Sequence, residues 1–180
     1  MSGAPLLGDR RIEGGGGREL RVDGEPFLNF AGCNYLALGD RPEPRAAART
    51  AIDGGVPFSR FLVRDYGGFD EPFERVEAAA AVFYGTEAAV YLPSGYLIGA
   101  AGFAGLRPDF DVLVLDELAH WCLADAAVLC DAPVHTFRHR DPDDLGRVLA
   151  GLERQRPLVV TDGAYATTGA VPPLDRYYEL

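Results

Sequence analysis

Short apolar runs alternate with amphipathic segments through the second half of the chain. The runs cover residues 88–92, 112–115, 134–137 and 158–161. Between them the pattern predicts helices over 95–106 and 121–130, and a third that begins at Pro142 after the capping residue Asp141. Strands that are apolar throughout and alternate with helices indicate a mostly parallel sheet flanked by helices on both faces. This half is therefore predicted to have an α/β fold.

The first half has a polar start, a hairpin and a helical arm. Residues 1–17 are polar and end in four glycines, which predicts a flexible lead. Apolar positions on both sides of Asp23-Gly24 predict two short strands joined by a tight turn. An alanine-rich helix is predicted over 43–53, where Gly54-Gly55 ends it.

A further helix is predicted over 71–83, with an apolar face formed by Phe73, Val76, Ala80 and Phe83. The last residues, from Asp175, begin another helix in which the chain stops. We therefore interpret the chain as a flexible lead, an N-terminal arm or small-domain segment and a truncated large α/β domain, over residues 1–17, 18–68 and 69–180.

Composition and charge narrow the class of protein. The chain has 180 residues, of which 48% are hydrophobic, and a net charge of −10. An acidic surface argues against non-specific binding to nucleic acids or anionic membranes. Three cysteines without CxxC spacing predict reduced, buried thiols, and no signal pattern or membrane-length apolar run is present. We expect a soluble, cytoplasmic protein.

All 17 basic residues are arginine, and the chain contains no lysine. A GC-rich genome, which favours arginine codons, would explain this composition. The chemical consequence remains, because lysine is the side chain that forms imines with carbonyl cofactors.

Two strand ends carry candidate functional residues. Ser94-Gly95-Tyr96 joins an apolar run to a helix, and free amides at a helix N-terminus suit a phosphate group. The alternative is an ordinary N-cap formed by Ser94. Asp116 ends the next run, and His120 follows four residues later, where an imidazole could stack on a flat ligand or act as an acid or base. The alternative is a surface or capping histidine.

The remaining reactive side chains are interpreted as structural. His135 and His139 lie on a strand and in a polar turn, so the histidines lack the spacing of a metal site, and no metal is expected. Cys130 lies near His135 in sequence, but its apolar neighbours indicate a buried structural cysteine.

Taken in order, six motifs resemble those of the α-oxoamine synthases, which include 8-amino-7-oxononanoate synthase and serine palmitoyltransferase. The match begins with Asn29-Phe30 and Asn34-Tyr35-Leu36-Ala37-Leu38. It continues with Ser59-Arg60, Tyr84-Gly85-Thr86-Glu87-Ala88-Ala89 with Ser94-Gly95-Tyr96, Asp116-Glu117-Leu118-Ala119-His120, Arg138-His139 with Asp141, and Thr161-Asp162-Gly163 with Gly169 and Pro173-Leu174.

The resemblance implies a fold type I enzyme that depends on pyridoxal 5'-phosphate (PLP), a homodimer with shared active sites, in the aminotransferase class I/II group. It assigns Ser94, Gly95 and Tyr96 to the PLP phosphate and His120 to stacking on the pyridine ring. It places Asn34, Ser59 and Arg60 on the substrate side. The implied reaction is the decarboxylative condensation of an amino acid with an acyl thioester.

The sequence also departs from the family pattern. Ala166 stands where the family has a serine, and the loop around Ser59 lacks the family's dense glycines. The family's imine-forming lysine and its pyridinium-pairing aspartate would lie beyond residue 180. We therefore expect this chain alone to be inactive and to need a complementing C-terminal half. The alternatives are a non-catalytic remnant that acts by binding or dimerisation, a divergent aminotransferase-like member, and an unrelated α/β phosphate-binding domain.

Overall fold

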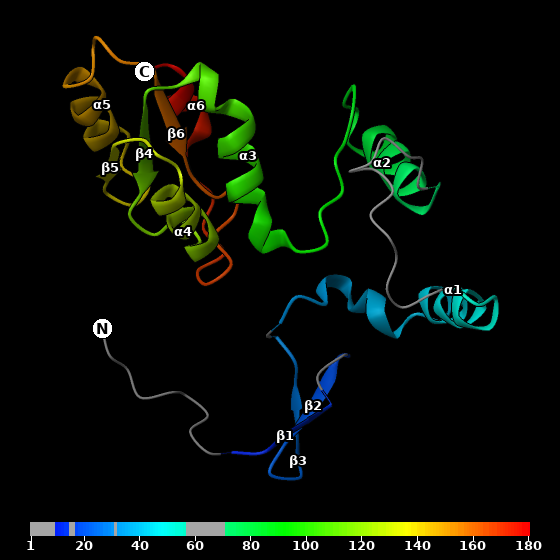
Figure 1. The fold of residues 1–180 in the computed structure, drawn as a ribbon. Helices are drawn as coiled ribbons and strands as arrows, with labels where there is room; N and C mark the ends of the chain where they lie inside the picture. The colour runs from blue at the N-terminus through cyan, green and yellow to red at the C-terminus, as the bar shows by residue number, and fades with distance from the viewer. Residues whose placement is uncertain (1–9, 15–16, 31, 57–70) are drawn as a thin grey trace. The chain divides into compact units, whose positions relative to one another are not determined.

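The computed structural model describes residues 10–14, 17–30, 32–56 and 71–180. The chain divides into two compact units, Met1–Phe69 and Asp70–Leu180. Figure 1 shows the elements of both units, coloured along the chain. No helix within the described ranges combines the length and apolar character needed to cross a bilayer.

The N-terminal unit contains a three-stranded antiparallel sheet with the order β1-β2-β3 (Ile12–Gly14, Glu19–Val22 and Glu25–Leu28). The predicted hairpin is confirmed: Asp23 and Gly24 have φ angles of 53° and 85°, as a two-residue hairpin turn requires. β1 lies in the segment expected to be a flexible lead, where Glu13 pairs with Arg21. With three residues, β1 is too short for its sequence to show the alternation of apolar and polar positions that predicts a strand.

The N-terminal unit continues through two helices. A 3-10 segment, η1 (Tyr35–Asp40), leads into α1 (Pro42–Asp53). The predicted end of α1 is confirmed, because Gly54 is its C-cap and Gly55 adopts a φ of 75°.

A three-stranded parallel sheet lies at the centre of the second unit, with the order β5-β4-β6 (Val134–Phe137, Val112–Asp116 and Pro157–Val160). Its register pairs Asp116 with Phe137 and Leu115 with Val160, so the three carboxyl ends lie at one edge. All five residues of the central strand β4 are buried. These strands coincide with the three predicted runs to within one residue at each end.

Helices cover both faces of this sheet (Figure 1). Leu113 and Leu115 pack against α3 (Ile98–Leu106) and α4 (Trp121–Leu129). The alternate residues Val112 and Val114 form a second cluster, with α5 (Pro142–Ala150) and Tyr177 of α6 (Leu174–Tyr178). Successive side chains of a strand point to opposite faces, so one strand contributes to both clusters. The predicted α/β architecture with a parallel sheet is confirmed.

Helices α3 and α4 approach closely at Gly99. A Cβ atom at this position would lie 2.9 Å from the Ala126 Cβ and 3.0 Å from the Cys122 carbonyl oxygen. Because real Cβ atoms do not come this close to other atoms, the contact requires glycine. The close approach fixes the first turn of α4 against α3.

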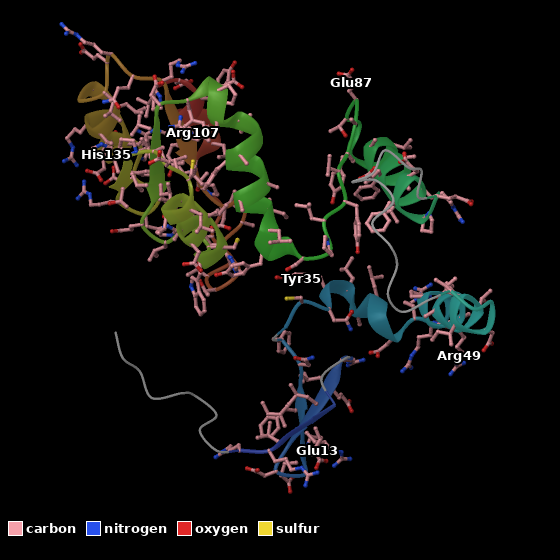
Figure 2. The ribbon with its side chains drawn as sticks, viewed as in Figure 1. Glu13, Tyr35, Arg49, Glu87, Arg107 and His135 are labelled. Carbon is pink, nitrogen blue, oxygen red and sulfur yellow. The ribbon has the colours of Figure 1, made fainter. Side chains whose placement is uncertain are left out.

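Two arginines hold the loops at the amino end of β4. Arg107, labelled in Figure 2, donates hydrogen bonds to the carbonyl oxygens of Phe110 at 2.9 Å and Asp131 at 2.6 Å. Arg156 binds the Asp111 carboxylate through Nη2 at 2.8 Å, and this hydrogen bond lowers the pKa of Asp111 to about 2. The loops that lead into β5 and β6 are thus tied to the start of the central strand β4.

Residues 88–92, which were predicted to form a strand, have no strand partner among the described residues, so this prediction was wrong. Val90 is 76% exposed, and the Tyr91 amide instead donates to the Glu77 carboxylate of α2 (Glu71–Tyr84) at 2.9 Å. An apolar run becomes a strand only where another strand completes its hydrogen bonds.

The apolar face predicted for α2 is not buried. Val76 and Phe83 are 48% and 81% exposed, whereas Glu77 is the residue that α2 buries. The helix itself was predicted correctly, because its 3.6-residue periodicity is local. Whether its apolar face is buried depends instead on residues that are distant in the sequence.

Candidate functional site

Asp116 is the centre of a hydrogen-bond network at the carboxyl end of β4. Its side chain is buried, and it accepts hydrogen bonds from the amides of Leu118 at 2.9 Å and Arg140 at 3.0 Å and from the His139 ring at 2.9 Å. Burial raises the pKa of Asp116, but hydrogen bonds from Tyr165, these two amides and His139 outweigh burial and lower it. The carboxylate is therefore ionised and fully engaged.

Tyr165 connects this network to the loop after β6. It is 4% exposed; its hydroxyl lies 2.6 Å from the Thr161 Oγ1, and its ring meets the His139 ring edge-on at 4.4 Å between centroids. Burial raises the pKa of the Tyr165 hydroxyl, and the Asp116 carboxylate adds to this rise. Gly169, with a φ of 67°, closes the turn that Tyr165 begins. The loops after β4, β5 and β6 are thus held together by Asp116, His139 and Tyr165.

His120 is the N-cap of α4. Its amide donates to the Asp162 carboxylate at 2.8 Å, and its Nδ1 accepts a hydrogen bond from the Cys122 amide at 3.3 Å. Its carbonyl oxygen accepts from the Leu123 amide at 2.8 Å. Backbone and ring are therefore both fixed, one by the end of β6 and the other by the first turn of α4.

A shallow pocket of about 220 Å³ lies beside the His120 ring. Trp121 borders it, is 78% exposed and is the single tryptophan of the chain. The His120 and Trp121 rings lie 6.5 Å apart at an angle of 22°. Complete ligand pockets enclose about 300–1,000 Å³, so this pocket is smaller than a complete ligand site. The lining residues are Glu117, Leu118, Ala119, His120, Trp121, Asp162, Tyr165, Ala166 and Thr167.

The Ser94 turn starts the 3-10 segment η3 (Gly95–Leu97) that leads into α3. Ser94 is an N-cap whose Oγ accepts from the Tyr96 amide at 3.3 Å, as the alternative interpretation of this residue predicted. The Gly95 amide has no acceptor among the described residues. The Tyr96 hydroxyl donates to the Asp125 carboxylate of α4, which raises the pKa of Tyr96. None of these three residues lines the pocket beside His120.

The other predicted site residues lie elsewhere. Asn34 belongs to the N-terminal unit, where its Oδ1 accepts from the Gly39 amide at 2.8 Å and its side chain lines a pocket of about 400 Å³. Ser59 and Arg60 lie outside the described residues. The structure thus brings His120 together with Asp162 and Tyr165, while Asn34 lies in a different unit.

Three contacts of the site were not predicted from the sequence. His139 was interpreted as part of a polar turn, yet it binds Asp116; the two follow neighbouring parallel strands, and that pairing could have revealed the contact. Asp162 binds the His120 amide from 42 residues away, and Cys122 contacts the His120 ring. Asp162 follows β6, which also pairs with β4, so the same reasoning applies to it, whereas no sequence signal marks the Cys122 contact.

An aminotransferase class I and II family model matches residues 26–180. The chain belongs to this family. Among its relatives, an 8-amino-7-oxononanoate synthase of Citrifermentans bemidjiense is 35% identical over 172 residues, which are 95% of this chain and 44% of the relative. A second, from Aromatoleum aromaticum, is 34% identical over 163 residues, which are 89% of this chain and 41% of the relative. The chain thus spans less than half the length of these aminotransferase-family relatives.

Solved structures of the family agree with the fold. A Sphingomonas wittichii serine palmitoyltransferase superposes with a TM-score of 0.80 and 28% identity, over 90% of this chain and 41% of that one. A serine palmitoyltransferase of S. paucimobilis with a bound PLP–myriocin aldimine has a TM-score of 0.77 and 26% identity, over the same shares of the two chains. The resemblance to α-oxoamine synthases and the expected fold type I are therefore confirmed.

Proposed function

We propose that this chain is part of a PLP-dependent acyltransferase of the α-oxoamine synthase kind. The reaction would be the decarboxylative condensation of an amino acid with an acyl thioester. The single observation that carries the proposal is the fixed His120 ring at the wall of an aromatic pocket, in a chain whose relatives include 8-amino-7-oxononanoate synthase. The related serine palmitoyltransferase with a bound PLP–myriocin aldimine supports PLP as the cofactor.

The described residues fit one side of a PLP site. His120 lines the pocket together with Trp121, where a pyridine ring could stack on its imidazole. The Gly95 amide is free to donate to a phosphate oxygen, and an anion could replace the Ser94 hydroxyl as acceptor of the Tyr96 amide. When bound, PLP would supply an electron sink, while the protein supplies orientation and electrostatics. Asn34, Ser59 and Arg60 are proposed to contact the substrate.

Two departures limit what these residues can do. Ala166 lines the pocket where the family has a serine, and the neighbouring Thr167 carries the hydroxyl that could replace it. The 180 residues contain no lysine, so they hold no side-chain amine for covalent attachment of PLP. We propose that they bind PLP without a covalent bond and are inactive alone. The missing lysine equally favours a second candidate function, a non-catalytic binding or dimerisation module.

Borohydride reduction of the chain with PLP is expected to leave no pyridoxyl group on any side chain. Borohydride reduction traps imines as stable amines. Because the chain has no lysine, its α-amine is the remaining primary amine that could form an imine with PLP. Peptide mapping by mass spectrometry separates an N-terminal adduct from an internal one. A reduced adduct on an internal peptide would contradict the proposal that binding is non-covalent.

PLP is expected to quench the fluorescence of Trp121 with a saturable binding curve, because this single tryptophan borders the pocket. Pyridoxal, which lacks the phosphate, should bind more weakly. Because it absorbs light as PLP does, it also shows how much of the fluorescence loss comes from absorbance and not from binding. His120→Ala should weaken PLP binding by about tenfold, the upper range for loss of one aromatic stacking contact.

The matched control for this titration is His135→Ala, because His135 lies on β5 and does not line the pocket. It should bind PLP with the affinity of the unchanged protein. If PLP gives no saturable quenching, or if both histidine variants bind alike, the proposed cofactor site is wrong.

The proposed partners are an amino acid, an acyl thioester and a second polypeptide, either another copy in a homodimer or a complementing C-terminal half. Large apolar side chains exposed on two helices support a protein partner. They include Val82 and Phe83 of α2, at 85% and 81%, and Val128 and Leu129 of α4, at 84% and 80%. We also propose a biosynthetic, cytoplasmic enzyme, which the three free cysteines support.

A further inference from the structure

The two nitrogens of the His120 ring have different surroundings. The Cys122 Sγ lies 3.0 Å from its Nδ1, and the Cys122 amide donates to the same nitrogen at 3.3 Å. A backbone amide can only donate, so Nδ1 must accept and carry no proton. A neutral imidazole protonates one nitrogen, so the proton lies on Nε2. Nε2 has no hydrogen-bond partner within the described part of the chain.

The sulfur of Cys122 is held in place by its surroundings. Cys122 is the second residue of α4 and is 9% exposed. Its carbonyl oxygen faces Gly99 of α3, in the close contact that excludes any larger residue there. It forms no disulfide. The thiol therefore stays next to Nδ1, and it is nearer to this nitrogen than the amide is.

We propose that Cys122 is a positioning residue for His120. Its thiol donates to Nδ1 together with its own amide, which fixes one tautomer and one ring orientation. The Asp162 carboxylate fixes the backbone of His120 at the same time. The ring thus presents its flat face and an Nε2–H donor, and Nδ1 is not available as a base. The consequence for ligand binding rests on the proposed PLP site, but the effect on the ring does not.

Nitrogen-15 NMR of the histidine side chains tests the effect on the ring without any ligand. The chain has three histidines, so the signals can be assigned by single substitutions. The unchanged protein should show His120 in one form, with Nδ1 unprotonated. In Cys122→Ala the backbone amide remains, but at 3.3 Å its hydrogen bond is long and holds Nδ1 only weakly. The variant should therefore add a population with the proton on Nδ1 and broaden the ring signals. Cys122→Ser, which keeps a donor, should retain the single form.

The matched control is Cys130→Ala, the same change just after the other end of α4. It should leave the His120 signals unchanged, and backbone amide spectra of every variant show whether the fold is kept. If the fold of Cys122→Ala is lost, Cys122→Val, which has no side-chain donor and leaves no cavity, replaces it in the comparison with Cys122→Ser. A mixture of tautomers in the unchanged protein, or a Cys122→Ala spectrum identical to it, would overturn the proposal.

Titration with PLP, followed by Trp121 fluorescence, then separates the two proposals. Cys122→Ala should bind about three- to tenfold more weakly, as expected for loss of one net hydrogen bond, and Cys122→Ser within about twofold of the unchanged protein. If the tautomer changes as expected but the unchanged protein does not bind PLP, the cofactor proposal fails and the role of Cys122 stands. Normal binding by Cys122→Ala with a disordered ring would show that the orientation has no effect on the ligand.

Discussion

Asp116→Ala is expected to lower the free energy of unfolding by about 3–5 kcal/mol, the usual cost of removing one member of a buried charged network. The Asp116 side chain is buried and accepts from two amides, His139 and Tyr165. Alanine would leave these donors without an acceptor, away from water. Urea unfolding followed by far-UV circular dichroism measures the change.

The matched control is Asp111→Ala, which removes the same side chain at the other end of β4. The Asp111 side chain is 42% exposed and pairs with Arg156, so its donors can turn to water when it is removed. The stability loss should be much smaller than for Asp116→Ala. Equal losses in the two variants would show that the Asp116 network does not hold the site together.

The pH dependence of the Asp116 effect follows from its lowered pKa. A carboxyl group with a lower pKa in the folded state stabilises the protein above its unfolded pKa of about 3.9. This stabilisation is lost as the pH falls through the folded value. The difference between the unchanged protein and Asp116→Ala should therefore be constant near neutral pH and shrink below about pH 4.

The parallel sheet could be predicted because its strands are short, mostly apolar and separated by helices. The runs at 112–115 and 134–137 became β4 and β5 with little change. The run at 88–92 is also apolar, yet it forms no strand in the described structure, because nothing there pairs with it. Composition thus predicts that a segment can enter a sheet, and its neighbours decide whether it does.

The location of the candidate site could be predicted from the sequence, but the contacts between its residues could not. Asp116 and His120 follow a predicted strand, and parallel strands bring their carboxyl ends to one edge. The partner of the His120 amide, Asp162, lies 42 residues further along the chain. The relation between Cys122 and the His120 ring depends on how α3 and α4 meet at Gly99. Such contacts follow from tertiary packing, which no sequence window contains.

Leu145→Ala is expected to lower the free energy of unfolding by about 2–5 kcal/mol, the range for a leucine removed from a packed core. Leu145 lies on α5, is fully buried, and packs with Val112, Val114 and Phe137 between the helix and the sheet. Alanine would leave a cavity, because strand positions on this side are fixed by the β4 hydrogen bonds. Urea unfolding measures the change.

Leu129→Ala is the matched control, since it makes the same substitution on another nine-residue helix of the same unit. Leu129 is 80% exposed on α4 in the single chain, so in dilute solution, where no partner covers it, little apolar contact is lost and the expected change is within about 0.5 kcal/mol. A large loss for Leu129→Ala, with a small one for Leu145→Ala, would mean that the stabilising core lies on the outer face of α4. The apolar residues there would then be covered in solution, and the sheet between α3–α4 and α5–α6 would not be the centre of this unit.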